Sequence, residues 1–346
     1  MSKKTHRSFR RGLVQSCREA VILKINLCDV ENAAARLSEI SVLTPLLTSP
    51  ELDDLAGGRV FIKPECLQRT GSFKIRGAYN MMSRLQPEQA GRGVVAWSSG
   101  NHAQGVAAAG TLLGIRTAIV MPEDAPRVKL ENTRRLGGEP ILYDRFSGDR
   151  EAIARAVAAE RGAELVPSYD HVDIIAGQGT VGLEIMQQCG AKGVNPDQVL
   201  IPCGGGGLIA GSAVAIRGLA PGTTVHPVEP EGMDDTARSL IAGQRLANDP
   251  SARSICDALQ AATPGRLTFE INRELLAGGI TVSDREVEDA MRFTFGNLKL
   301  VAEPGGAVAL AAILARKLET KGKVTVIVLS GGNVDAEMFA RVQRGE

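Results

Sequence analysis

The chain has 346 residues, which is too long for one small core and fits two compact lobes of about 100–200 residues each. A net charge of +1 gives no field strong enough to recruit nucleic acid or a membrane surface, so we expect a small-molecule partner. The six cysteines form no Cys-x-x-Cys pair, which argues against a zinc site or a disulfide framework and favours a reducing cytoplasm. No apolar run approaches the roughly 18 residues that a membrane span needs.

Residues 1–25 are predicted to form a basic N-terminal extension. The stretch MSKKTHRSFRRGLVQSCREA is rich in lysine and arginine, and the apolar stretch after it is short and interrupted by Lys24, which is unlike a secretory signal. We expect a loose extension. An organelle transit peptide is the alternative, because the segment is nearly free of acidic residues.

From about Val60 onward, short β-branched runs alternate with longer Ala-rich segments of helical period, a pattern typical of a parallel sheet covered by helices. The predicted strands are Arg59–Lys63, Gly93–Trp97, Arg116–Met121, Glu139–Tyr143, Glu164–Pro167, Gln198–Pro202, Thr223–Glu229 and Val324–Ser330. The predicted helices between them, each ending in glycine, are Asn101–Gly114, Ala125–Gly137 and Gly148–Gly162. The sequence therefore predicts an open α/β protein, with Gly243–Ser254 as a surface loop.

Three loops that follow predicted strands are rich in glycine and small polar residues. They are WSSGNHAQG, CGGGGLIAG and SGGN. Open parallel sheets bind ligands at the carboxyl ends of their strands, so we expect these loops to converge on one cleft.

Four consecutive glycines, Gly204 to Gly207, separate a β-branched strand from a helix that begins near Leu208. Backbone without side chains lets several N–H groups converge, and the positive end of the following helix favours an anion, so the segment can hold a phosphate. A tight strand-to-helix turn is the alternative. Because the segment lacks the Gly-x-Gly-x-x-Gly fingerprint and its downstream acid, the predicted ligand is a monophosphate and not a dinucleotide.

Lys74 lies in the stretch RTGSFKIRGA, next to Phe73 and two residues before Arg76. A desolvated lysine, or one beside another cation, has a lowered pKa and can form a Schiff base. Taken alone the position is weak evidence, because most lysines are solvated surface charges.

The stretch SSGNH, Ser98 to His102, places two hydroxyls, a glycine and an amide just before a predicted helix. The positive end of that helix can bind a substrate carboxylate. The alternative is an ordinary helix cap made by Ser99 or Asn101. His102 alone indicates a structural hydrogen bond, and Ser330 alone indicates a turn at the end of a strand.

Together these motifs resemble the fold-type II pyridoxal-phosphate enzymes, and within them the serine/threonine dehydratase and serine racemase group. The motifs are ECLQRTGSFKIRGA, SSGNHAQGVA, GQGTVGLEI, GGGGLIAG, VEPEG, AEPGGA and LSGGN, in the family's order from roughly Leu43 to Asn333. The resemblance implies two open, mostly parallel sheets with flanking helices, as in the tryptophan synthase β subunit. It implies a large cofactor-binding domain at residues 26–83 and 167–346, and a small mobile domain at residues 84–166.

By this resemblance, Lys74 binds pyridoxal 5'-phosphate as a Schiff base and acts as the catalytic base. The other implied cofactor contacts are Phe73, Asn101 at the ring hydroxyl, Gly204, Gly205, Gly206, Gly207 and Leu208 at the phosphate, and Ser330 at the ring nitrogen. The implied contacts to the substrate carboxylate are Ser98, Ser99, Gly100 and His102. Ser99 also matches the second proton-transfer hydroxyl of the racemases, so it is a second catalytic candidate and permits racemisation.

The resemblance implies β-elimination from an L-hydroxyamino acid, with L-threonine or L-serine first, to give a 2-oxo acid and ammonia. A neutral Ser330 at the ring nitrogen fits elimination better than transamination, because it does not enforce a protonated ring. The alternatives are a serine racemase and a dehydratase of 3-hydroxyaspartate, phenylserine or an ectoine-derived compound. A protein that binds the cofactor or an amino acid without turnover is the alternative from another class. We expect a cytoplasmic dimer or tetramer with no nucleic-acid or membrane partner.

Glu229, Met233 and Asp235 match positions at which some members of the group bind a divalent cation. Oxygen ligands at such a turn suit Mg²⁺ or Ca²⁺, so one of these ions is a further expectation. An acidic helix start is the alternative.

Two positions depart from the pattern of the group. Asp257 is followed by Ala258 where many dehydratases have glycine, and Gly305 stands where threonine or alanine is frequent. By the resemblance, the first position lies near the substrate, where the methyl group of Ala258 is expected to narrow or reshape the pocket. Both departures leave the preferred substrate open. The sequence ends soon after SGGN, so we expect no regulatory amino-acid-binding domain and no feedback by isoleucine.

Overall fold

The structure is a computed structural model that describes residues 25–125, 127–144 and 148–346. The predicted N-terminal extension lies outside these ranges except for Ile25, which is buried in the core beside α1 (Leu27–Leu37). In the described part of the chain, no helix is both long and apolar enough to cross a membrane. Residues 243–254 form a mostly exposed loop, as predicted.

Two separate sheets organise the part of the chain that the structure describes. The larger has the strand order β1-β2-β10-β7-β8-β9, in which only β1 runs antiparallel to its neighbour. Its strands are β1 (Leu47–Thr48), β2 (Arg59–Pro64), β7 (Gln198–Pro202), β8 (Thr224–Pro230), β9 (Ile280–Val282) and β10 (Val324–Leu329). The smaller sheet has the order β5-β4-β3-β6 and is parallel throughout. Its strands are β3 (Val94–Trp97), β4 (Thr117–Pro122), β5 (Gly138–Tyr143) and β6 (Glu164–Leu165).

The predicted fold class is confirmed, and a strand is present at each predicted position. The strands β1 and β9 were not predicted. With two and three residues, they are too short to show a periodic pattern.

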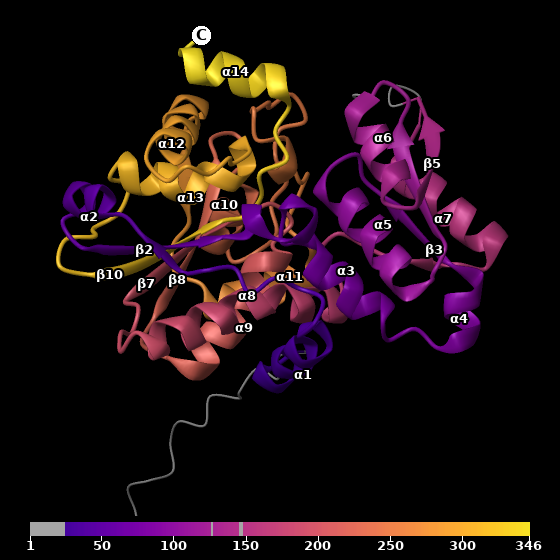
Figure 1. Ribbon diagram of the computed structural model, residues 1–346, viewed down its shortest axis with the longest axis horizontal. Coiled ribbons are helices and arrows are strands. Elements are labelled where there is room, and N and C mark those ends of the chain that lie inside the picture. The colour runs from indigo at the N-terminus through magenta and orange to yellow at the C-terminus, as the bar shows by residue number, and fades with distance from the viewer. Residues whose placement is uncertain (1–24, 126, 145–147) are drawn as a thin grey trace, which may run out of the picture.

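Helices surround both sheets (Figure 1). Around the smaller sheet lie α4 (Pro87–Arg92), α5 (Asn101–Leu113), α6 (Arg127–Arg135) and α7 (Arg150–Arg161). The remaining helices are α2 (Pro50–Ala56), α3 (Lys74–Met82), α8 (Val172–Ala191), α9 (Gly207–Leu219), α10 (Asp235–Ala242), α11 (Arg266–Leu275), α12 (Asp284–Gly296), α13 (Pro304–Leu314) and α14 (Ala336–Arg344). Short 3-10 helices in the described residues are η1 (Glu65–Leu67), η2 (Arg69–Gly71) and η3 (Asp257–Leu259).

The larger sheet is covered on both faces. Val326 and Val328 of β10 belong to the core cluster that includes residues of α8 and α9, whereas Ile327 and Leu329 belong to the cluster that includes residues of α13. Figure 1 shows α8 and α9 on one side of this sheet and α12 and α13 on the other. Alternate strand residues point to opposite faces, so a sheet covered on both sides needs nearly continuous apolar strands.

A buried cluster of charges joins the end of β2 to α3 and α8. The Arg76 guanidinium donates hydrogen bonds to Glu65 at 2.7 and 2.9 Å and to Glu184 at 2.6 and 2.9 Å. Lys63 Nζ lies 2.6 Å from the Glu184 carboxylate. Two cations and two carboxylates balance one another, so the cluster is neutral overall and fixes the helix that begins at Lys74.

Candidate functional site

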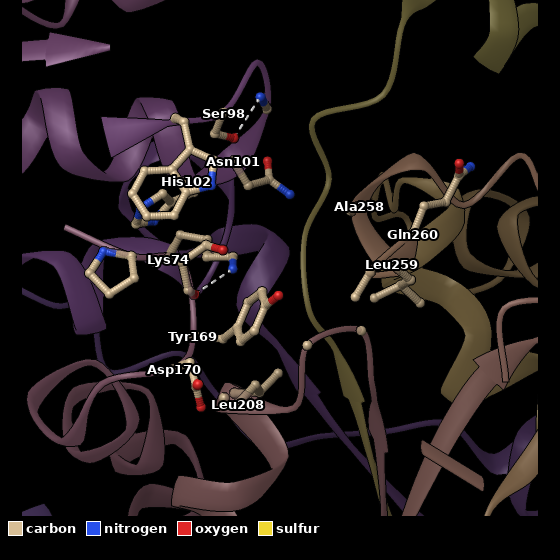
Figure 2. Close-up of a pocket in the computed structure, with 18 of the residues that line it drawn as sticks. Lys74, Ser98, Asn101, His102, Tyr169, Asp170, Leu208, Ala258, Leu259 and Gln260 are labelled. Atoms are coloured by element: carbon tan, nitrogen blue, oxygen red, sulfur yellow. Dashed lines mark hydrogen bonds between the residues drawn. The ribbon is translucent and has the colours of Figure 1, made fainter. Parts of the chain in front are cut away.

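A cavity of about 1140 Å³ opens at the carboxyl ends of strands from both sheets. The segments that follow β3, β6, β7 and β10 line it, so the structure brings the three predicted loops together. This volume is enough for a cofactor and a small substrate together. Figure 2 shows the lining residues, with Lys74, Asn101 and Tyr169 on one side and Ala258, Leu259 and Gln260 across from them.

Lys74 is the first residue of α3 and is partly buried at the cavity wall. Its Nζ donates a hydrogen bond to the Ser168 carbonyl at 3.0 Å and lies 5.1 Å from the centre of the Phe73 ring. Burial lowers the pKa of Lys74 to about 8, and the nearby Glu303 opposes this effect. The amine is therefore far easier to deprotonate than a solvated lysine, as Schiff-base chemistry requires.

Arg76 does not explain the lowered pKa of Lys74, contrary to the hypothesis drawn from the sequence. Its positive charge is balanced by Glu65 and Glu184 in the buried cluster, and burial is the cause of the shift at Lys74. Arg76 thus contributes to the packing of α3 through its ion pairs and does not line the cavity.

The four glycines after β7 form a concave turn at the start of α9. Gly206 precedes the helix with a φ of +91°, and no side chain caps the first turn. A methyl group on Gly205 would lie 2.3 Å from the Tyr169 ring, and one on Gly207 would lie 2.5 Å from the Gln178 side-chain oxygen. Only backbone fits here, and the uncapped N–H groups at the start of the helix suit a phosphate.

The start of α5 is a second helix end without a side-chain cap. Gly100 precedes the helix, and the Ser98 hydroxyl accepts a hydrogen bond from the Gly100 N–H at 3.2 Å without reaching the helix itself. The alternative in which Ser99 or Asn101 caps the helix is therefore wrong. The starts of α5 and α9 thus line the same cavity without a side-chain cap, and the N–H groups of each can bind an anionic group.

Both the nitrogen and the oxygen of the Asn101 side-chain amide are hydrogen-bonded. Its Nδ2 donates to Glu303 Oε1 at 2.5 Å, and its Oδ1 accepts from Asn333 Nδ2 at 2.7 Å. Burial, together with the nearby Asp257, raises the pKa of Glu303 to about 7. Glu303 and Asn333 lie in the motifs AEPGGA and SGGN, yet neither residue was assigned to the site from the sequence.

His102 and Ser330 also line the cavity. The His102 Nε2 donates to the Val166 carbonyl at 2.8 Å, and burial, followed by the charge of Lys74, lowers its pKa to about 3. His102 is thus a neutral residue with a structural hydrogen bond. Ser330 directly follows β10 and is 5% exposed, and its carbonyl accepts from the Phe73 N–H at 3.3 Å.

The far wall of the cavity was indicated from the sequence only at Asp257 and Ala258, which the resemblance places near the substrate. It is formed by η3 and Gln260, and Asp257 in η3 makes an ion pair of 2.9 Å with Lys129 of α6. Tyr169 was missed as well, because the segment after β6 carries no glycine signal.

The predicted cation site lies apart from this cavity. Glu229 accepts hydrogen bonds from two backbone N–H groups at the start of α10, at 3.1 and 2.8 Å, and Asp235 accepts from Asn248 at 2.6 Å. Burial raises the pKa of Glu229 to about 8 and that of Asp235 to about 6. No group of three or more metal-binding His, Cys, Asp or Glu side chains occurs in the described ranges. Here Glu229 serves as the acceptor at an acidic helix start.

Comparison with known proteins agrees with this geometry. The family described as Pyridoxal-phosphate dependent enzyme matches residues 38–331. The L-threo-3-hydroxyaspartate ammonia-lyase of Pseudomonas sp is 44% identical over 317 residues, which cover 92% of this chain and 98% of that protein. The serine racemase of Schizosaccharomyces pombe is 40% identical over 312 residues, which cover 90% of this chain and 95% of that protein.

A solved structure shows the same similarity. The structure of maize serine racemase has a TM-score of 0.86 and 38% sequence identity, and the match covers 92% of this chain and 97% of that one. The residues at both uncapped helix ends and at Lys74 fit the cofactor that the family name implies. The chain therefore belongs to the pyridoxal-phosphate dependent enzyme family.

Proposed function

We propose that the protein is a pyridoxal-phosphate-dependent ammonia-lyase that removes the β-hydroxyl of an L-hydroxyamino acid and releases a 2-oxo acid and ammonia. The observation that carries this proposal is Lys74, an amine with a lowered pKa in the same cavity as two uncapped helix ends. When bound, pyridoxal phosphate supplies the electron sink that makes the Cα proton of an attached amino acid acidic.

Lys74 would hold the cofactor through Nζ and take the Cα proton of the substrate, because an amine with a pKa of about 8 is neutral often enough to act as a base. The backbone N–H groups of Gly204–Gly207 and Leu208 at the start of α9 would bind the phosphate. The segment from Ser98 to His102 at the start of α5 would bind the substrate carboxylate. Ser98, Ser99 and Gly100 would make the contacts to it.

Asn101 would donate a hydrogen bond from its side-chain amide nitrogen to the ring hydroxyl of the cofactor. Its Oδ1 already accepts from Asn333, and one N–H of its Nδ2 already donates to Glu303, so the second N–H is the group that remains for the cofactor. Ser330 would face the ring nitrogen as a neutral partner, which favours elimination over transamination. The ring of Phe73, beside Lys74, would help to exclude water from the amine.

For the substrate, we place L-threo-3-hydroxyaspartate first, ahead of L-threonine and L-serine. This reverses the order expected from the sequence. The Pseudomonas relative carries the name of that substrate, and Lys129 and Arg150 line the cavity from helices of the smaller sheet, where a second carboxylate can meet a cation.

Serine racemisation is the second candidate. It is favoured by Ser99, whose hydroxyl lies in the segment that lines the cavity and can act as a second proton-transfer group. The serine racemase of S. pombe is among the relatives. Chiral analysis of L-serine incubated with the enzyme separates this activity from elimination.

A substrate screen tests the proposed function. The purified protein, loaded with pyridoxal phosphate, should form 2-oxo acid and ammonia in equal amounts, with the highest kcat/KM on L-threo-3-hydroxyaspartate among the three substrates. A higher kcat/KM on L-threonine or L-serine would restore the earlier order. Cofactor binding without 2-oxo acid from any hydroxyamino acid would refute the ammonia-lyase and support a binding protein without turnover.

Four expectations from the sequence stay predictions. They are the cytoplasmic location, the dimer or tetramer, the mobility of residues 84–166 as a small domain, and a divalent cation at Glu229, Met233 and Asp235.

A further inference from the structure

The segment η3 forms the cavity wall opposite Lys74 (Figure 2). Ala258 at its centre and Leu259, which is 6% exposed, both line the cavity. The ion pair between Asp257 and Lys129 fastens the segment to α6 across the cavity. The segment η3 therefore presents the small side chain of Ala258 to the cavity, and its neighbours Asp257 and Leu259 fix where that side chain lies.

Behind this wall lies Gly305, a buried residue in the first turn of α13. A methyl group on Gly305 would lie 3.1 Å from Leu259 Cγ and 3.2 Å from the Ala258 Cβ. Carbon atoms in good contact lie about 3.5–4.0 Å apart. The space that a side chain at position 305 would need is thus already taken by the methyl group of Ala258 and by Leu259.

The same segment also lies close to the glycine turn that follows β7. A methyl group on Gly204 would lie 3.1 Å from Leu259 Cα. Gly204 and Gly305 thus both lie against this segment. An atom added at position 305 presses on Ala258 and Leu259, which line the cavity, because side chains in a close-packed interior have little room to move.

This inference rests on the proposed function, which assigns a group of the cofactor or of the substrate to each of the other walls of the cavity. The phosphate belongs at the start of α9, the substrate carboxylate at the start of α5, and the Cα proton beside Lys74. The β-substituent, whose carboxylate in 3-hydroxyaspartate would meet Lys129 or Arg150, is left with the part of the cavity that η3 borders, because Asp257 of η3 pairs with Lys129 and Ala258 follows it. We propose that Ala258 and Gly305 are a coupled pair that sets the cavity width at the β-substituent and so determines substrate specificity.

A double-mutant cycle tests the pair, with the Tm and the kcat/KM values for L-threo-3-hydroxyaspartate and L-serine measured on cofactor-loaded protein. Gly305→Ala should lower the Tm by about 2–6 °C and lower both kcat/KM values, because the added methyl is too close to Ala258 and Leu259. Ala258→Gly should widen the cavity and raise the ratio of kcat/KM for 3-hydroxyaspartate over serine about tenfold. The double variant should regain most of the Tm lost in Gly305→Ala.

Gly306→Ala provides the matched control at the adjacent position. Its methyl group would lie 2.2 Å from the Gly331 carbonyl oxygen, a backbone atom that removal of the Ala258 methyl does not move. Ala258→Gly should therefore rescue Gly305→Ala and leave the defect of Gly306→Ala unchanged. If Gly305→Ala yields no folded protein, recovery of folded protein in the double variant is the expected result.

Additive Tm changes in the cycle, or equal rescue of both glycine variants, would overturn the coupling. If the Tm changes are non-additive but Ala258→Gly leaves the ratio of kcat/KM for 3-hydroxyaspartate over serine unchanged, the role in specificity is overturned. Absence of turnover by the cofactor-loaded wild type would instead refute the proposed function, and the role in specificity with it. The Tm cycle would still decide the coupling in that case, so the two failures are distinguishable.

Discussion

Replacing Lys74 with alanine should reduce the release of ammonia from the preferred hydroxyamino acid by at least about 1000-fold. Under the proposed function, the substitution removes both the group that holds the cofactor and the base for the Cα proton. The measurement is the rate of 2-oxo acid formation by protein supplied with excess pyridoxal phosphate. The visible absorption of lysine-bound cofactor should disappear as well.

Lys129→Ala is the matched control for the loss of the visible absorption. Lys129 lines the same cavity, but its Nζ is paired with Asp257 at 2.9 Å and lies on α6. This variant should keep the visible absorption, because Lys74 is intact. Ammonia release by Lys74→Ala at the rate of the wild type would contradict the proposed mechanism.

Replacing Arg76 with methionine should lower the free energy of unfolding by about 3–5 kcal/mol. The guanidinium is fully buried, and its loss leaves Glu65 without its main partner and Glu184 with Lys63 alone. A buried carboxylate that loses its cation costs much more than a surface pair is worth. The measurement is urea denaturation followed by far-UV circular dichroism.

Arg84→Met is the control for this effect. The Arg84 side chain is half exposed and lies 3.1 Å from Asp173, so its removal should cost no more than about 1 kcal/mol. If the free energy of unfolding falls by the same small amount in Arg76→Met and Arg84→Met, the buried cluster does not stabilise α3.

The sheets could be predicted because their strands are covered on both faces. A strand such as β10, with Val326 and Ile327 packed in different clusters, must be apolar along its whole length and is therefore visible in the sequence. The strand β9 has three residues and belongs to the sheet only through its pairing with β8, which no local pattern encodes.

The candidate site was predictable only where the signal is local. Gly204–Gly207 directly follow a strand, so their position in the sequence already indicates a phosphate site. Glu303 could not be assigned, because its contact with Asn101 joins residues 202 positions apart in the chain. Arg76 was misinterpreted for the same reason: its partners Glu65 and Glu184 neutralise it, and only the fold brings Glu184 to it.

Ala258 and Gly305 illustrate how two such departures become one feature in space. In the sequence they are separate deviations from the pattern of the resembling group. In the structure a methyl group on Gly305 would come within 3.2 Å of the Ala258 Cβ, so each residue limits what the other can be. Their positions in the chain offer no reason to connect them.

The central claim is that Lys74 holds the cofactor, and chemical trapping tests it most directly. The protein loaded with pyridoxal phosphate is reduced with borohydride and digested, and the modified peptide is identified by mass spectrometry. We expect the pyridoxyl phosphate group on Lys74, in the peptide that contains Phe73. Modification of another lysine in the cavity, such as Lys129, or no modified peptide at all, would contradict the account.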